Sequence, residues 1–187
     1  MTNSPATSLL SPGLLAGCSI ALAGEGELGA ATAAACGDLG ADVARLPASD
    51  ESAVAAALPD PLEVLVVDAA ARFEAGGLRE ALDGAWVAVR AAGTTRMIQA
   101  GGGKVVLLAP RPGAGEHASA ARDGLENLAR TLSIEWARHR IAITAVHPGV
   151  QTTAADVGAL AAFLASPAGD YYSGCRFSLG CAGPPAA

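Results

Sequence analysis

Several absences from the sequence limit what the chain can be. No uninterrupted apolar run of about 18 residues occurs, so no membrane-spanning helix is predicted. No basic residue precedes Arg45, so the stretch 14–18 ("LLAGC") lacks the positive start of a secretory or lipoprotein signal. We interpret 14–18 as the lead into a first strand. The cysteines contain no Cys-x-x-Cys pair and no metal-ligand spacing, which predicts no metal site and favours buried free thiols in a reducing cytoplasm. They are Cys18, Cys36, Cys175 and Cys181.

The composition is that of one folded domain. The chain has 187 residues, of which 51% are hydrophobic, with a mean hydropathy of +0.37, and this excludes a disordered protein. A net charge of -6 and a pI near 4.9 make nucleic acid and anionic membranes unfavourable partners. We expect a flexible segment over 1–13, a single domain over 14–181 and a flexible tail over 182–187.

Short apolar runs alternate with alanine-rich helical segments along the chain. This alternation predicts a Rossmann-like, doubly wound parallel sheet of about six strands in a three-layer α/β/α sandwich. The expected strands are 19–24, 41–46, 63–69, 104–109, 141–146 and 175–179. The expected helices are 27–40, 49–58 (opening at Ser49), 77–100, 118–138 and 155–166.

The turn after the first strand is rich in glycine. Gly24, Gly26 and Gly29 would let the backbone approach a pyrophosphate at a helix N-terminus. Glu25 and Glu27 oppose this, because each like charge near a pyrophosphate costs on the order of 1 kcal/mol or more at a partly buried site.

Segments along nearly the whole chain, about 14–180, resemble the short-chain dehydrogenase/reductase family. They are "LLAGCSIALAGEGELGAA", "VLVVDAAARF", "GGGKVVLLAP", 118–153 and "VGALAAFLASPAGDYYSGCRFSLG". The resemblance implies an NAD(P)-dependent oxidoreductase fold. It assigns the cofactor to the glycine turn, to Asp68 and Ala69 in the place of the family's asparagine motif, and to a later loop. That loop contributes Pro148, Gly149 and Thr153.

The departures from the family fall on its reactive positions. Pro110 stands in place of the serine, Ala118 in place of the tyrosine and Arg122 in place of the lysine. A tyrosine with an ordinary pKa of about 10 passes the proton in that reaction, and a methyl group donates none. His117 is the nearest titratable substitute, but the adjacent helical position points about 100° away.

Two structural pieces of the family also look absent. The last helix follows Thr153 almost at once, so the usual lid is missing. One strand–helix unit is missing between 46 and 63, which predicts that 41–46 forms an edge of the sheet.

The helices that pair between subunits in this family look complete over 77–100 and 118–138. Both carry an apolar stripe and further apolar residues off it, such as Val87 and Ile134. This pattern predicts a homo- or hetero-oligomer through these helices, with an intact family member as one candidate partner.

Three functions are compatible with the sequence. The first is a non-catalytic cytoplasmic subunit that assembles with an active dehydrogenase, with NAD(P) binding weak or lost. The second is an active NAD(P)-dependent oxidoreductase with non-standard acid–base residues, such as His117. The third is an NAD(P)-binding sensor without turnover. A truncated relic without function also remains open.

Overall fold

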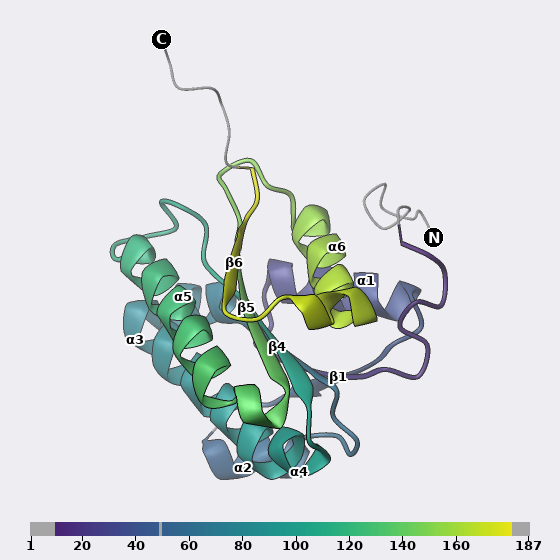
Figure 1. The fold of residues 1–187 in the computed structure, drawn as a ribbon. Helices are drawn as coiled ribbons and strands as arrows, with labels where there is room; N and C mark the ends of the chain where they lie inside the picture. Colours follow the sequence, from purple (N-terminus) through teal and green to yellow (C-terminus); the bar gives the residue numbers. More distant parts are fainter. Residues whose placement is uncertain (1–9, 49, 181–187) are drawn as a thin grey trace.

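The protein folds around a six-stranded parallel sheet, as the alternating pattern predicted (Figure 1). The computed structural model describes residues 10–48 and 50–180. The strand order is β2-β1-β3-β4-β5-β6, and every neighbouring pair is parallel. The strands are β1 (Ser19–Ala23), β2 (Asp42–Leu46), β3 (Val64–Asp68), β4 (Gly103–Leu108), β5 (Ile141–His147) and β6 (Cys175–Ser178).

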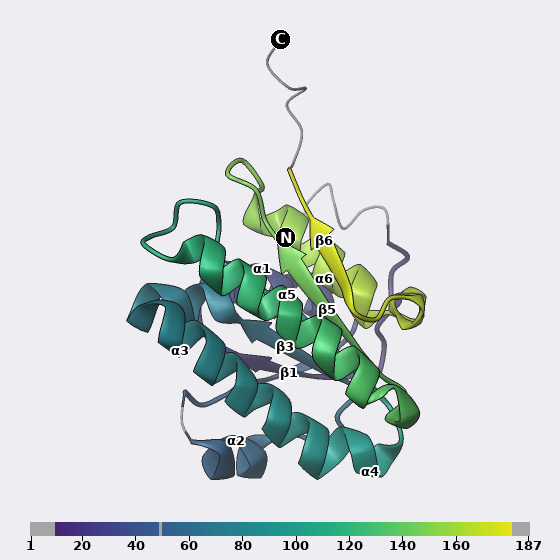
Figure 2. The same cartoon turned by 60° about the vertical axis from the view of Figure 1, so that its left-hand side comes forward.

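Helices cover both faces of the sheet and complete the three layers. Helices α1 (Glu27–Asp38) and α6 (Ala154–Ala165) pack together on one face. Helices α3 (Ala69–Ala92) and α5 (Ala118–Glu135) lie side by side on the other, with α2 (Glu51–Ala57) against α3 (Figure 2). Short turns of helix follow α3, α5 and α6 at Gly93–Met97 with α4 (Ile98–Ala100), at Ala137–His139 and at Pro167–Tyr171.

The core forms two apolar layers, one on each side of the sheet. Along β3, Leu65 and Val67 face α3 and α5, whereas Val64 and Val66 face α1 and α6. Every residue of β3 is buried, which explains why the strand is a continuous apolar run rather than an alternating one.

The helix expected over 77–100 is present, but it is the second part of a longer element. A first helical segment, which was not expected, begins at Ala69, where the side chain of Asp68 accepts a hydrogen bond from Ala71 N and caps it. Non-helical residues interrupt the element at Gly76 and Gly77, and at its end the chain widens into a π-helical turn over Gly93–Met97.

Two further helix boundaries are corrected. Helix α2 begins at Glu51 and is capped by Asp50, which accepts from Ala53 N at 2.9 Å, whereas Ser49 lies outside the described residues. Helix α5 ends at Glu135 because Trp136 leaves the helical conformation and packs its ring over Gly93, where a Cβ would collide with it.

The ends of the sheet agree with the shortened pattern. β2 is an edge strand, and only the segment 148–153 separates β5 from α6. Cys18, Cys36 and Cys175 are free thiols, whereas Cys181 and the tail 182–187 lie outside the described residues. Within 10–48 and 50–180, no helix has the length and apolar character to cross a bilayer.

Candidate functional site

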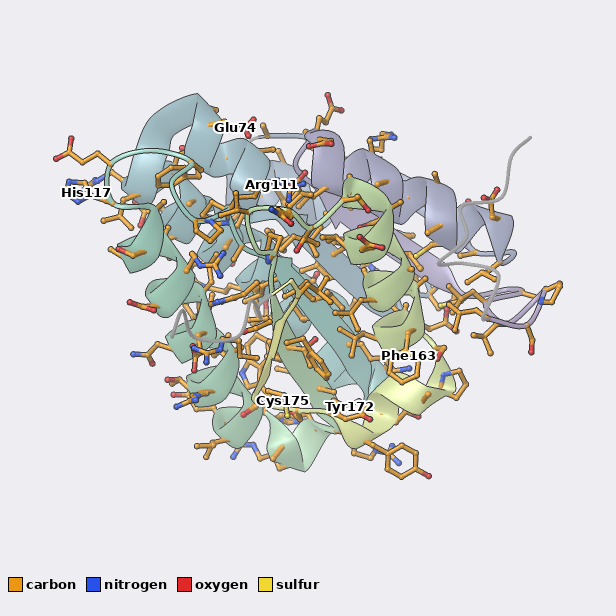
Figure 3. The ribbon with its side chains drawn as sticks, turned by 90° about the horizontal axis from the view of Figure 1, so that it is seen from above. Glu74, Arg111, His117, Phe163, Tyr172 and Cys175 are labelled. Atoms are coloured by element: carbon orange, nitrogen blue, oxygen red, sulfur yellow. The ribbon has the colours of Figure 1, made fainter. Side chains whose placement is uncertain are left out.

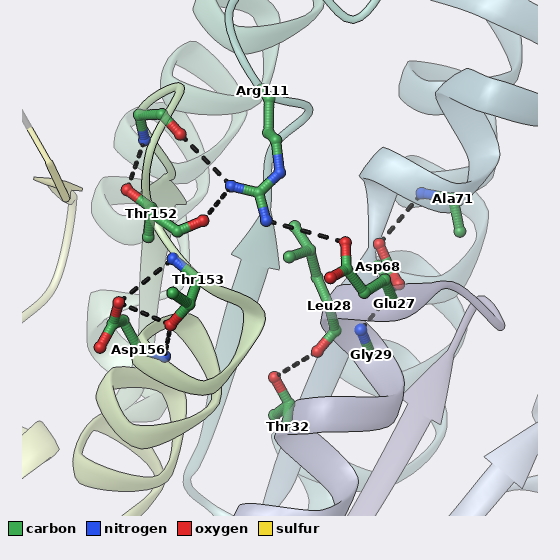
Figure 4. A network of polar contacts seen from close by, with 11 residues as sticks. Glu27, Leu28, Gly29, Thr32, Asp68, Ala71, Arg111, Thr152, Thr153 and Asp156 are labelled. Carbon is green, nitrogen blue, oxygen red and sulfur yellow. Dashed lines mark hydrogen bonds and ion pairs between the residues drawn. The ribbon is translucent and has the colours of Figure 1, made fainter. Parts of the chain in front are cut away.

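The carboxyl ends of the strands meet at one edge of the sheet, where a fold of this kind binds its ligands. At this edge the Asp68 carboxylate occupies the glycine turn (Figure 4). Its Oδ2 accepts hydrogen bonds from Gly29 N at 2.8 Å and Gly26 N at 3.2 Å. Its Oδ1 accepts from Ala71 N at 3.0 Å. The fully buried carboxylate therefore caps α1 and α3 together.

The glycines of this turn are required by contacts within the protein. A Cβ at position 26 would lie 2.7 Å from Asp68 Oδ2, and one at position 29 would lie 2.9 Å from the same atom. Gly24 adopts φ +102°, and a Cβ there would lie 2.7 Å from the Asp68 carbonyl oxygen. The glycine pattern that predicted a close approach to pyrophosphate is thus also explained by the close approach of β3.

The turn does not fit a pyrophosphate group as it stands. A buried carboxylate already takes two of the N–H groups at the start of α1. The adjoining cavity has a volume of about 290 Å³ and is lined by Glu27, Asp68 and Glu74 as well as Arg111. A dianion there would meet mainly negative charge, and the volume is just below the roughly 300–1,000 Å³ typical of ligand pockets.

Arg111 crosses this edge, and nothing in the sequence pattern identified it. Its Nη1 donates to the carbonyl oxygens of Gly149, at 3.3 Å, and of Thr152, while its Nη2 lies 3.7 Å from Glu27 Oε2 (Figure 4). Because the Glu27 side chain is 74% exposed, its ion pair with Arg111 contributes little to the stability of the fold. The carbonyl contacts join the loop after β4 to the loop after β5.

The place of the family's tyrosine is filled with apolar atoms. Ala118 is 3% exposed and packs in a cluster with Phe73, Ala81 and Ala121. His117, the possible substitute for the phenol, lies outside this cluster: its side chain is 62% exposed and lies 3.4 Å from Glu116. Figure 3 shows His117 pointing outward at the periphery, away from Arg111.

Arg122, in the place of the lysine, joins two strand ends. Its Nη1 donates to the carbonyl oxygen of Pro110 at 2.6 Å and to that of Pro148 at 2.9 Å. These contacts hold the loops after β4 and β5 against α5. The cation therefore has a structural role at a position where the family uses one for chemistry.

The loop after β5 is built from internal hydrogen bonds. Gly149 N donates to Thr152 Oγ1 at 2.9 Å, and that hydroxyl donates to Leu179 O at 3.1 Å. Thr153 and Asp156 form a capping box at the start of α6, so the Thr153 hydroxyl is engaged with the helix. Ala69, predicted near a cofactor, is a fully buried residue in the first turn of α3.

His147 ends β5 beneath this loop and is 2% exposed. Burial, together with the charges of Arg122 and Arg176, lowers its pKa from 6.5 to about 4. Its Nε2 is buried and makes no hydrogen bond with the residues that the structure describes. The imidazole is thus held neutral at this position.

A larger cavity of about 970 Å³ lies at the opposite, amino edge of the sheet, lined by Cys18, Glu63 and Lys104 among others. Lys104 Nζ donates to the carbonyl oxygens of Ala165 and Ser166 and pairs with Asp170 at 2.7 Å. Burial and the nearby Glu63 raise the pKa of the Cys18 thiol to about 11, which makes it unreactive. In the described ranges, no cluster of at least three His, Cys, Asp or Glu residues could hold a metal ion.

The comparisons with known proteins agree with this architecture. The structure is similar to a citronellol catabolism dehydrogenase from Pseudomonas aeruginosa, with a TM-score of 0.76, 23% identity and coverage of 91% of this chain and 96% of that chain. A variant of a Serratia marcescens short-chain dehydrogenase/reductase gives a TM-score of 0.73, 19% identity and coverage of 89% and 97%. The structure of BdcA from E. coli gives a TM-score of 0.66 and 20% identity, with coverage of 89% of this chain and 100% of that chain.

No protein-family model matches the sequence, and no curated protein matches it either. The structural likenesses show that the chain has a shortened short-chain dehydrogenase/reductase-like fold, as the resemblance predicted.

Proposed function

We propose that this protein is a non-catalytic, short-chain dehydrogenase/reductase-like subunit that acts by assembling with an active enzyme of the same fold. The observation that carries the proposal is the buried Ala118, which replaces the proton donor and is packed against Phe73 and Ala81. A reaction that loses a positioned acid slows by roughly 10²–10⁴-fold.

The other reactive positions support the same conclusion. Arg122 donates hydrogen bonds to two loop carbonyl oxygens. Arg111, in the loop after β4, donates to a carbonyl oxygen of the loop after β5 at the carboxyl edge of the sheet. These side chains stabilise the edge instead of leaving it open to a substrate. The active oxidoreductase depending on His117 is less well supported, because that side chain points into solvent.

Exposed apolar side chains on α3 and α5 support assembly. Much of the apolar stripe predicted on these helices packs within the chain: Val89, Met97, Leu125 and Leu132 are buried. Trp86 on α3 is nevertheless 40% exposed and Ile134 on α5 is 78% exposed. Large apolar side chains on adjacent helices favour a protein partner there.

The test is a tagged purification from the native host, followed by reconstitution with the dehydrogenase that is recovered. We expect a stoichiometric complex with an intact short-chain dehydrogenase, measured by mass spectrometry and by light scattering. The double variant Trp86→Glu and Ile134→Glu is expected to lose the complex, because a charge buried in an interface without a partner is strongly unfavourable.

The matched control is Val150→Glu with Tyr171→Glu, which changes exposed apolar residues outside α3 and α5 (73% and 88% exposed) and is expected to retain the complex. A wild-type protein that is a stable monomer and recovers no dehydrogenase would overturn the proposal. Equal recovery by the Trp86 and Ile134 variant would also overturn it.

Restoring the family's residues is expected to give no enzyme. In the variant Ala118→Tyr with Arg122→Lys, the phenol must enter a closed apolar cluster, and we expect a stability loss of roughly 1–3 kcal/mol. Turnover of alcohols or ketones, followed by NAD(P)H absorbance, should stay at background. The control Ser119→Tyr changes an exposed neighbour and should unfold at the wild-type urea midpoint. Turnover gained by the double variant would favour an oxidoreductase instead.

A further inference from the structure

We infer that Asp68 is a resident anion: its carboxylate takes the place at the start of α1 that a dinucleotide's pyrophosphate needs, so this chain excludes NAD(P). The inference concerns the ligand edge and is independent of the proposed assembly, because nucleotide binding and oligomeric state are measured separately.

The hydrogen bonds of Asp68 are those of a bound anion at a helix N-terminus. One oxygen receives the N–H groups of Gly26 and Gly29, at 3.2 and 2.8 Å, and Asp68 comes from a strand about 40 residues along the chain. Anions bind helix N-termini through such N–H groups and through the positive end of the helix dipole. In this protein the anion is covalently part of the fold.

The carboxylate has little freedom to move aside for a ligand. Asp68 is fully buried, and its second oxygen caps α3 through Ala71 N at 3.0 Å. A rotation that frees the start of α1 would therefore leave both helices without this cap. A mobile side chain would yield to a ligand, whereas this one is fixed from two sides.

The charges beside Asp68 act in the same direction. Glu27 and Glu74 line the small cavity next to it, and Arg111 is the cation among its lining residues. Arg111 already donates to the carbonyl oxygens of Gly149 and Thr152. A pyrophosphate would need to displace these contacts and approach three carboxylates.

The test is calorimetric titration of the full chain with inorganic pyrophosphate, NAD+ and NADP+. We expect no binding to the wild type at millimolar ligand. Asp68→Asn removes the charge and keeps the shape, and should raise the affinity for pyrophosphate by at least about tenfold. The matched variant Glu25→Gln with Glu27→Gln removes exposed charges beside the same turn and should give a smaller gain.

Micromolar binding of NAD+ or NADP+ by the wild type would overturn the inference, as would an Asp68→Asn variant with no gain over the wild type. If that variant does not fold, amide resonances of the wild type decide. The Gly26 and Gly29 amides should exchange slowly without ligand and should not shift with pyrophosphate. Shifts of these two amides would show that the carboxylate yields to the ligand, which overturns the inference.

Discussion

Replacing Asp68 by alanine is expected to lower the free energy of unfolding by about 3–5 kcal/mol. The change removes three hydrogen bonds to a charged acceptor, each of which contributes roughly 1.5–3 kcal/mol before the cost of burying the carboxylate is subtracted. Gly29 N would be left unpaired in a buried position, whereas Gly26 N and Ala71 N are only part-buried and gain water. Urea unfolding followed by tryptophan fluorescence measures the loss.

Asp50→Ala is the matched control for this prediction. Asp50 caps α2 through a single exposed hydrogen bond to Ala53 N, at 2.9 Å, and its loss should cost about 1 kcal/mol. A clear difference between the two variants would show that the Asp68 side chain links β3 to both α1 and α3. If Asp68→Ala costs no more than Asp50→Ala, the carboxylate is an ordinary helix cap.

The fold was predictable because burial on two faces leaves a signal in the sequence. Val64, Leu65, Val66 and Val67 form a continuous apolar run that only a strand covered on both sides requires. The sequence lacks a strand–helix unit between β2 and β3, and the prediction drawn from this, that β2 forms an edge of the sheet, is confirmed. The order of the elements thus predicted the topology, although the helical segment that Asp68 caps at Ala69 was not predicted.

The site was less predictable because the same residues serve an external or an internal anion. Gly24, Gly26 and Gly29 indicate a close approach of something to the backbone, and a glycine pattern does not distinguish a phosphate from a side chain. Asp68 reaches the turn across a sequence separation of 39 to Gly29. Only the register of β3 beside β1 brings the carboxylate there.

Arg111 was missed for a related reason. Its hydrogen-bond acceptors are backbone carbonyl oxygens, of Gly149 and Thr152, which any sequence would supply. The sequence does show that the side chain of Ala118 cannot donate a proton, and the structure adds that Phe73 and Ala81 pack against it. An apolar cluster therefore surrounds the position at which the resemblance would place the proton donor.

Acidification between pH 6.5 and 4 is expected to destabilise the protein through His147. The buried imidazole has a pKa of about 4 in the folded protein, against 6.5 when exposed in the unfolded chain. In this window the unfolded chain binds a proton that the folded protein does not, so stability falls as the pH falls. At about 1.36 kcal/mol for each pKa unit, the contribution of His147 is about 3 kcal/mol, and it does not grow below pH 4.

His147→Asn removes the titrating group and should reduce the loss of stability between pH 6.5 and 4 by about 3 kcal/mol relative to the wild type. Urea unfolding at several pH values across this window measures the difference in slope. His139→Asn, in the turn after α5, is the control and should follow the wild-type slope because Arg176, Arg122 and the burial of His147 are unchanged. Parallel curves for His147→Asn and the wild type would mean that the imidazole takes up its proton over the same pH range in the folded and unfolded protein. The lowered pKa of His147, and its neutral state in the folded protein, would then be wrong.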